Sequence, residues 1–393
     1  GAAGGTGDGG GGGLLWVVGL VLLVPVLLAT AFWFLLPRET FWQVFTKPQT
    51  QRGLDLAGVR EHLRNHTILH IGGLHRSGTT LLWEALARHP AISRLEFQPG
   101  ADRRHGHHMT KVYNEGIFLQ SVYPKFGLDH KRFVLKKWFG QFVRKIPFLP
   151  HDSLPWTNLR EGVGRFALHP EHHLDEASAL VDEGSQSRLF NQWALFWDLR
   201  RPVLMEKSPS NVVIGPFLHR LWGLGAPTLT SPAKFLFLQR HPVAVALATL
   251  RAGGETVNDL PVSALVEHWL AAEERRAGDV ARYFAGLGGG GAEAAVRVVT
   301  MEAVCREPAR HLRELLVWLG LAPDEAALRA FEGSAKRDPN RKYFLSFCEG
   351  LLQPGSARAA EHAELVDRFA QRVLAVSPYD LRELPDLCRA FAP

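Results

Sequence analysis

The longest uninterrupted apolar run of the chain spans residues 14–36, which contain no charged side chain. At ~1.5 Å of rise per residue, a helix of this length reaches about 34 Å, which is enough to cross a hydrocarbon core of about 30 Å. We therefore predict a single transmembrane helix here. A cleaved signal peptide stays open as the alternative, because Ala29-Thr30-Ala31 weakly resembles a cleavage site.

Beyond this run, short apolar segments alternate with segments of helical periodicity. A β-branched stretch, Thr67–Ile71, leads into a glycine-rich turn, and an apolar-periodic helix then runs from Thr79 to a stop at Pro90. Such alternation is typical of an α/β fold, in which a parallel sheet carries helices on both faces. The later predicted pairs of strand and helix are Val203–Met205 with 211–222, Lys234–Leu238 with 242–251, and Val296–Thr300 with 308–319.

Composition divides the chain into four sections. Residues 1–13 are mostly glycine and are expected to form a disordered tail. The transmembrane anchor at 14–36 is followed by a stem at 37–64 and by one enzyme-sized domain at 65–393. Within that domain, residues 97–200 are irregular and rich in His, Trp and Phe, which favours an insertion that binds an acceptor molecule.

The charge balance is mildly basic. Forty-five Lys and Arg residues against 39 Asp and Glu residues give a net charge of +6, with no concentrated basic run that would indicate nucleic acid binding. Three cysteines, Cys305, Cys348 and Cys388, allow one disulfide with one free thiol, and no Cys-x-x-Cys metal pattern exists.

The most informative segment is Ile71–Thr80, Ile-Gly-Gly-Leu-His-Arg-Ser-Gly-Thr-Thr. A strand, a glycine-rich turn and a helix N-terminus together bind phosphate, because backbone N–H groups and the helix dipole converge on the anion. Gly73 and Gly78 keep the Walker spacing, but Thr79 stands where that pattern has lysine, and Arg76 supplies the cation from inside the loop. This predicts a P-loop-type protein that is a poor ATPase. The alternative is a plain turn with Ser77 or Thr79 as helix cap.

A second candidate element follows the apolar strand at 234–238. A magnesium-using nucleotide hydrolase commonly ends such a strand in a carboxylate, whereas this strand leads to Arg240. Arginine suits a second phosphate better than a metal ion. Pro242 then begins the next helix. Arg240 could instead pair with a carboxylate.

These elements, in this order, resemble the sulfotransferases that use 3′-phosphoadenylyl sulfate (PAPS). The run His75–Thr80 resembles their 5′-phosphosulfate loop, Glu206-Lys207-Ser208-Pro209 a middle element, and Arg240-His241-Pro242 the element that holds the 3′-phosphate. The segment 298–302 and the helix after it resemble the closing strand and helix of the family. The resemblance covers roughly residues 65–385 and implies PAPS as co-substrate, with no metal required.

The resemblance also implies the residues of the nucleotide site. Where the family has a serine eight positions after the arginine, this chain has Ala248, and Thr249 comes next. The implied nucleotide-binding residues are Gly73, His75, Arg76, Ser77, Gly78, Thr79, Thr80, Arg240, Ala248 and Thr249.

Sulfuryl transfer needs a base for the acceptor hydroxyl and cations for the departing phosphate. Arg76 suits the phosphate, and Lys207 resembles the lysine that protein-tyrosine sulfotransferases place near the scissile bond. The base stays open between Glu96, which lies nearly where those enzymes have a glutamate, and Glu115. A histidine is the third possibility, at His105, His107 or His108.

Signals for location conflict. Arg38, Lys47 and Arg52 follow the apolar run, which on the positive-inside rule leaves the domain in the cytosol. Membrane-anchored sulfotransferases, which the layout resembles, carry it in the Golgi lumen, and we follow the resemblance. Asn65-His66-Thr67 is a candidate glycosylation sequon in such a glycoprotein.

The sequence thus favours a membrane-bound sulfotransferase that acts on a hydroxyl of a carbohydrate or a protein tyrosine. Two other classes stay open: a P-loop kinase or nucleotide hydrolase, and a catalytically inactive nucleotide-binding membrane protein, which Ala248 would suit.

Overall fold

The structure is a computed structural model. It describes residues 52–96, 115–124, 166–168, 170–225, 231–252, 261–287 and 291–391, together with Leu23 and Leu27, which are helical. Within these ranges no helix is both long and apolar enough to cross a membrane. Apart from Leu23 and Leu27, the predicted anchor at 14–36 lies outside the described residues, as do the tail at 1–13 and the candidate bases His105, His107 and His108.

Five parallel strands form the central sheet, in the order β2-β3-β1-β4-β5. The predicted parallel sheet is confirmed, and so are its strands near 67, 203, 234 and 296. The three-residue strand β2 at one edge comes from a segment for which we predicted no strand. The bounds are β1 Thr67–Gly72, β2 Ile92–Arg94, β3 Val203–Lys207, β4 Ala233–Gln239 and β5 Val296–Thr300.

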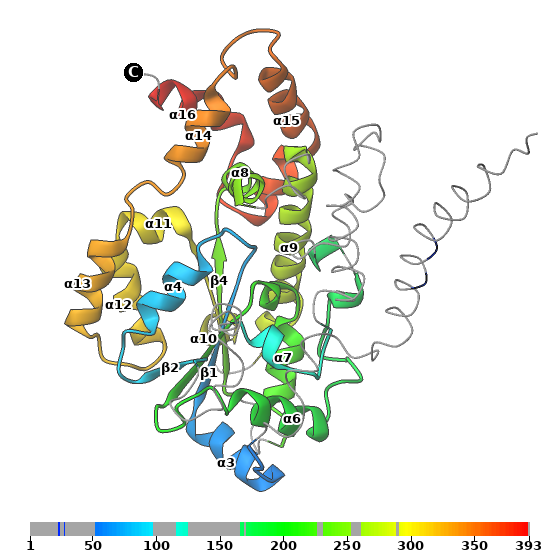
Figure 1. Cartoon of the computed structure of the whole chain (residues 1–393), viewed down its shortest axis with the longest axis vertical. Coiled ribbons are helices and arrows are strands. Elements are labelled where there is room, and N and C mark those ends of the chain that lie inside the picture. Colours follow the sequence, from blue (N-terminus) through cyan, green and yellow to red (C-terminus); the bar gives the residue numbers. More distant parts are fainter. Residues whose placement is uncertain are drawn as a thin grey trace, which may run out of the picture.

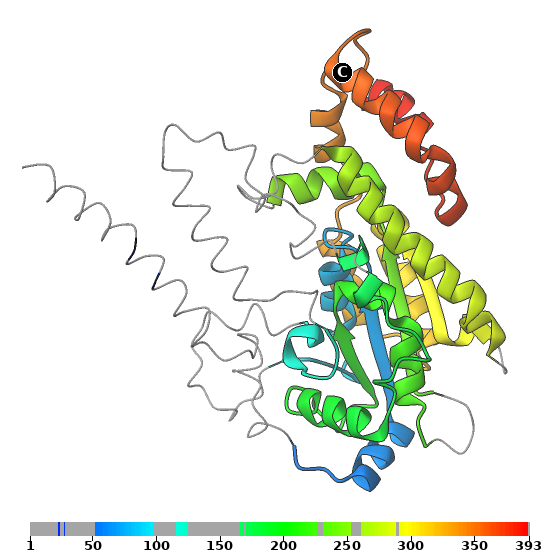
Figure 2. The same cartoon turned by 90° about the vertical axis from the view of Figure 1, so that its right-hand side faces the viewer.

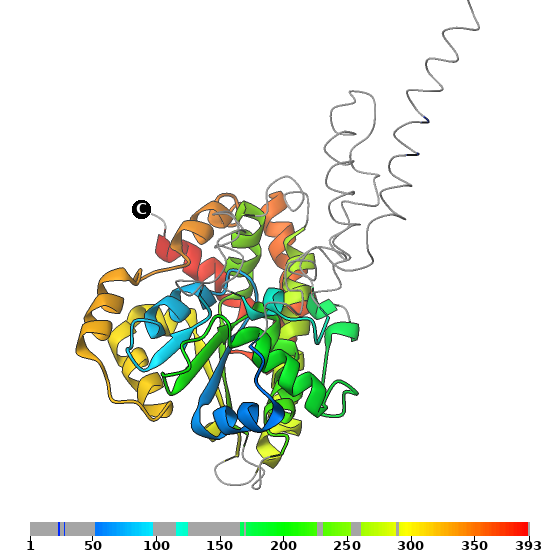
Figure 3. The same cartoon turned by 60° about the horizontal axis from the view of Figure 1, so that its bottom comes forward.

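Both faces of the sheet are covered, because alternate side chains of the buried strands enter two separate hydrophobic clusters. On β1, Ile68 packs into the cluster that includes helices α6 (Glu183–Trp193), α7 (Gly215–Trp222) and α9 (Val262–Arg282). Leu69 and Ile71 pack into the cluster with α4 (Thr79–Leu86), α11 (Met301–Arg306), α12 (Pro308–Trp318) and α13 (Glu325–Ser334). Figures 1 and 3 show these two groups of helices on opposite sides of the strands. The predicted helices on both faces are therefore confirmed.

The helices include several that we did not predict, chiefly after residue 260. The longest, α9, runs obliquely beside the sheet in Figure 2, and α15 packs against it. The helices are α3 Leu56–Asn65, α4 Thr79–Leu86, α6 Glu183–Trp193, α7 Gly215–Trp222, α8 Pro242–Ala252, α9 Val262–Arg282, α10 Gly291–Ala295, α11 Met301–Arg306, α12 Pro308–Trp318, α13 Glu325–Ser334, α14 Arg341–Cys348, α15 Ala357–Val376 and α16 Leu384–Phe391.

Two short helical turns position the site. The 3₁₀ turn η3, Gly116–Leu119, lies inside the predicted insertion, and η9, Pro209–Val213, directly follows the Glu-Lys-Ser segment. Helix α3 comes from the predicted stem and buries Val59 and Leu63 in the main cluster.

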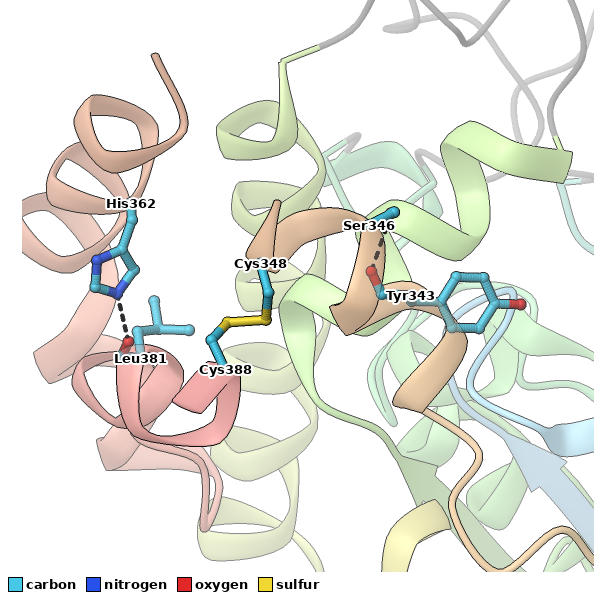
Figure 4. The surroundings of a disulfide bond; sticks show 6 residues. All are labelled: Tyr343, Ser346, Cys348, His362, Leu381 and Cys388. Carbon is cyan, nitrogen blue, oxygen red and sulfur yellow. Dashed lines mark hydrogen bonds between the residues drawn. A yellow bond between two sulfur atoms is a disulfide. The ribbon is translucent and has the colours of Figure 1, made fainter. Parts of the chain in front are cut away.

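A disulfide joins Cys348 at the end of α14 to Cys388 on α16, while Cys305 is a buried free thiol. Figure 4 shows this bond and places Tyr343 on the same helix as Cys348. Two of the last helices are thereby fixed to each other covalently.

Candidate active site

The loop between β1 and α4 has the backbone that a phosphate-binding turn requires. Gly73 has a φ of 140° and Gly78 a φ of 99°, which is the region that glycine adopts most readily. A Cβ on Gly73 would lie 2.4 Å from the carbonyl oxygen of Leu238 on β4, and one on Gly78 would lie 2.4 Å from the Sδ of Met301. Both glycines are therefore fixed by φ and by close packing. Arg76 has a φ of 73° and is the single described non-glycine residue with positive φ.

Helix α4 opens toward this loop. Its N-cap is Gly78, which supplies no side-chain acceptor, so neither Ser77 nor Thr79 has the capping role of the plain-turn alternative. The first N–H groups of a helix have no partner inside it. Ser77 is 1% exposed, and its hydroxyl finds no hydrogen-bond partner within the described residues. The buried Ser77 hydroxyl and the uncapped N-terminus of α4 lie at the same turn, and both can donate hydrogen bonds to a phosphate oxygen. The loop therefore fits the nucleotide that the sequence predicts.

Lys207 and Glu115 meet beside the loop. The Nζ of Lys207 lies 2.6 Å from Oε1 of Glu115, and the two side chains are 3% and 16% exposed. Lys207 ends β3, level with Ile71 at the end of the neighbouring strand β1. A strong ion pair shielded from water thus lies at the edge of the sheet where the loop begins.

His75 belongs to the same cluster. Burial lowers the pKa of His75, Glu115 opposes that shift, and Lys207 and Arg76 reinforce it. The imidazole is therefore largely neutral at pH 7. These influences also mark Glu115, Lys207 and Arg76 as its charged neighbours.

The other candidate base, Glu96, lies elsewhere. Its carboxylate pairs with Arg94 at 2.7 Å and is 57% exposed. It lines a polar cavity of about 510 Å³ together with residues of α4 and β2, Arg88 just after α4, and Arg201 in the turn before β3. The structure therefore brings Glu115, and not Glu96, to Lys207.

Arg240 follows β4 and is held by three hydrogen bonds. Its Nε donates to Oδ1 of Asn340 at 2.8 Å, and its two terminal nitrogens donate at 2.7 Å to the carbonyls of Arg76 and Pro339. Its guanidinium also lies over the ring of Tyr343, 5.1 Å from the centroid. No carboxylate of the described chain lies within salt-bridge distance of it. Arg240 thus connects the loop to the segment before α14.

The two nucleotide-binding candidates on α8 have no side-chain donor available for a phosphate. Ala248 is buried at 2% exposure. Thr249 donates its hydroxyl proton to the carbonyl of Val245 at 2.8 Å, so that proton is already used inside the helix. Thr80, in the first turn of α4, is exposed.

Sequence reasoning missed several residues around Arg240. Glu302, one residue past the start of α11, accepts hydrogen bonds from the amide of His241, from Asn340 and from Tyr379. A carboxylate just beyond a strand end was a usable signal for Glu302. Asn340 carried none, because it lies 100 residues from Arg240 in the chain.

Comparison with known proteins gives a family match. The family model described as "Sulfotransferase family" matches residues 69–325, well over half of the chain. No curated protein matches the sequence.

Solved structures give weak likenesses to bacterial sulfotransferases. One is the sulfotransferase domain of the Synechococcus PCC 7002 olefin synthase, with 20% identity over 84% of this chain and 95% of that chain and a TM-score of 0.35. Another is a sulfotransferase from Alicyclobacillus acidocaldarius, with 16% identity over 80% and 97% and a TM-score of 0.38. A third, from Mycobacterium tuberculosis, has 15% identity over 69% and 72% and a TM-score of 0.38. Identities and TM-scores this low carry no argument about activity.

Proposed function

Because this chain belongs to the sulfotransferase family, we propose that it transfers a sulfuryl group from PAPS to a hydroxyl group of an acceptor. The observation that carries the proposal is the ion pair of Lys207 and Glu115 at 2.6 Å, beside a loop whose buried Ser77 hydroxyl has no partner within the described residues.

The donor would be held by two groups of residues. The loop Gly73–Thr80 surrounds the 5′-phosphosulfate with backbone N–H groups, Arg76 and the Ser77 hydroxyl. Arg240 suits the 3′-phosphate, since a guanidinium has five N–H donors and three are engaged by Asn340, Arg76 and Pro339. That leaves two donors for phosphate oxygens.

The chemistry is divided between the members of the ion pair. Glu115 takes the proton of the acceptor hydroxyl while the oxygen of that hydroxyl forms the new bond to sulfur. Lys207 and Arg76 stabilise the negative charge on the departing 5′-phosphate oxygen as the old sulfur–oxygen bond breaks. The sulfuryl group ends on the acceptor, the proton on Glu115, and adenosine 3′,5′-bisphosphate leaves.

The chain lacks two groups that a P-loop kinase or hydrolase needs. Thr79 replaces the Walker lysine, and β4 leads to Arg240 where a magnesium-binding carboxylate is usual. For an inactive binding protein, Ala248 and the engaged hydroxyl of Thr249 are the supporting observations.

We also propose a membrane-anchored location with the domain in an oxidising compartment such as the Golgi lumen. The apolar run at 14–36 supports the anchor. The disulfide supports the compartment, because such bonds persist in secretory spaces and are rare in the cytosol. Asn65, exposed at the end of α3, is accessible to glycosylation. A mobility shift of the membrane fraction with glycosidase, abolished in Asn65→Gln, tests this. A protein without the shift and with free thiols at Cys348 and Cys388 contradicts it.

The acceptor we propose is a hydroxyl of a carbohydrate or of a protein tyrosine. The buried ring of His75, close to Glu115 and Lys207, supports a site that excludes water, and it does not choose between the two acceptors.

Calorimetric titration of the full chain tests the donor. Adenosine 3′,5′-bisphosphate is expected to bind without magnesium and more tightly than ADP with magnesium. Arg240→Ala should weaken binding at least tenfold, whereas Arg372→Ala, which removes an exposed arginine paired with Glu274 on the outer helices, should not. Preference for ADP with magnesium would support the kinase class instead. Binding without release of the bisphosphate from PAPS would support the inactive class.

A further inference from the structure

Directly beside Lys207 lies a carboxylate that the transfer reaction does not use. Glu206 is fully buried on β3, and its strand partner on β1 is His70. Burying an ionised carboxylate is costly unless hydrogen bonds compensate for the lost water. The contacts of Glu206 must therefore account for its presence in the core.

Four groups donate to its two oxygens. Oε2 accepts from Nδ2 of Asn211 at 2.6 Å and from Nδ1 of His70 at 3.2 Å. Oε1 accepts from the amide of Gly116 at 2.9 Å and from the hydroxyl of Ser208 in a very short bond. An ionised carboxylate offers about four acceptor positions, and all are filled.

The donors on the Oε2 side cannot reverse. Trp222 donates its indole N–H to Nε2 of His70 at 2.9 Å, and an indole can only donate, so the proton of the neutral ring is on Nδ1. The same amide nitrogen of Asn211 also donates to the carbonyl of Ile71, at the end of β1. Glu206 is thus fixed as an acceptor.

The Oε1 side of Glu206 holds the segment that carries Glu115. Gly116 donates to Glu206, and the next amide, Ile117, donates to the hydroxyl of Ser208 at 3.0 Å. The carbonyl of Gly116 accepts from Trp193 at 3.0 Å. A Cβ on Gly116 would lie 2.4 Å from Cγ of Glu206, so only glycine allows this approach. The two residues that follow Glu115 are thereby tied to Glu206 on β3 and to Ser208 directly after it.

We propose that Glu206 is a positioning residue, which holds Glu115 against Lys207 by fixing the amides of Gly116 and Ile117. The positioning role itself does not depend on the proposed function; only the purpose of the Glu115–Lys207 pair, sulfuryl transfer, rests on it. Glu206 touches neither donor nor acceptor. Its effect reaches the reaction through the distance between Glu115 and Lys207.

Glu206→Gln tests this on the full chain. The new NH₂ is expected to face Gly116 and Ser208, because the Ser208 hydroxyl can turn to accept, whereas His70 and Asn211 are held as donors. Gly116 then loses its acceptor. Deuterium exchange in the peptide covering residues 115–120 should rise at least tenfold, and turnover of PAPS should fall by about 100-fold, the scale of a displacement of about 1 Å. The dissociation constant of adenosine 3′,5′-bisphosphate should stay within about threefold.

Ser208→Ala is the milder second variant, since it removes the acceptor of Ile117 and leaves Glu206 charged. It should raise exchange in the same peptide and lower turnover by a smaller factor. Asp279→Asn, which alters a buried carboxylate on α9 between Arg275 and Arg282, is the matched control and should change neither.

The possible outcomes distinguish a failure of the positioning role of Glu206 from a failure of the proposed function. Unchanged exchange at 115–120 in both Glu206→Gln and Ser208→Ala overturns the positioning role, whatever the enzyme does. So does faster exchange with wild-type turnover. A wild-type chain that fails to bind the bisphosphate contradicts the proposed function, while the exchange data still decide whether Glu206 holds the segment.

Discussion

Gly73→Ala is the substitution whose cost the structure defines best. The residue has a φ of 140°, which costs a side-chain-bearing residue about 1–3 kcal/mol. The new Cβ would also lie 2.4 Å from the carbonyl oxygen of Leu238, a backbone atom in a central strand that cannot turn aside. Overpacking of this kind costs about 1–3 kcal/mol. We expect the variant to lose about 2–6 kcal/mol of unfolding free energy, the sum of these two contributions.

Two matched glycines separate the contributions in urea unfolding. Gly320 has a φ of 76° and open space around it, so Gly320→Ala should show the backbone cost alone, about 1–2 kcal/mol. Gly278 lies inside α9 with no strain and no neighbour within 4 Å, so Gly278→Ala should stabilise by about 0.5–1 kcal/mol. If Gly73→Ala costs no more than Gly320→Ala, the close packing of the loop on β4 is refuted.

Three further predictions concern the base, the disulfide and pH. Glu115→Gln should lower PAPS turnover by about 10²–10⁴ while bisphosphate binding changes little, whereas Glu96→Gln should leave turnover unchanged; the reverse result would reassign the base. Cys348→Ser should remove about 2–4 kcal/mol of stability, measured by urea unfolding against wild type under oxidising conditions, because the bond to Cys388 closes a loop of 40 residues. Burial lowers the pKa of His241 to about 3, so the unfolded chain takes up a proton below pH 6.5 that the folded chain does not, and stability falls as pH drops from 6.5 toward 3. In His241→Phe the new ring can keep the edge-on contacts with Phe344 and Tyr379. Between pH 7 and pH 4.5 the unfolding free energy of this variant should therefore fall by about 2–3 kcal/mol less than that of the wild type. An equal fall in both proteins would contradict a buried, neutral His241.

The central strands β1, β3 and β4 were predictable because they are buried on both faces of the sheet. Segments such as Phe235–Leu238 must then be apolar at every position, and a continuous apolar run between breakers is a strong signal. Strand β2 failed this test because it has three residues, one of them Arg94. Helix α9 carries a mixed pattern that includes buried Glu273 and Arg276, which pair with each other at 2.7 Å, so its sequence understates its burial.

The site was predictable where it depends on local backbone and unpredictable where it depends on distant contacts. Gly73 and Gly78 could be recognised because the turn between strand and helix requires them. The partner of Lys207 could not, since Glu115 is 92 residues away in sequence. Its approach depends on hydrogen bonds from Gly116 and Ile117 to Glu206 and Ser208, which exist only once β1 and β3 are in register.

The order of the strands in the sheet determines where the loop, Lys207 and Arg240 lie relative to one another. Along the chain the loop comes first, then Lys207, then Arg240, but β1 lies between β3 and β4 in the sheet. Because Ile71 is level with Lys207 and Gly72 with Phe237, the loop begins between the two cations at the same edge. Under the proposed function, the sulfuryl end of PAPS must then face β3, where Lys207 and Glu115 meet, and the 3′-phosphate must face β4 and Arg240. The reverse orientation would leave Glu115 without an acceptor to deprotonate, so under the proposed function the strand order determines the orientation in which the donor binds.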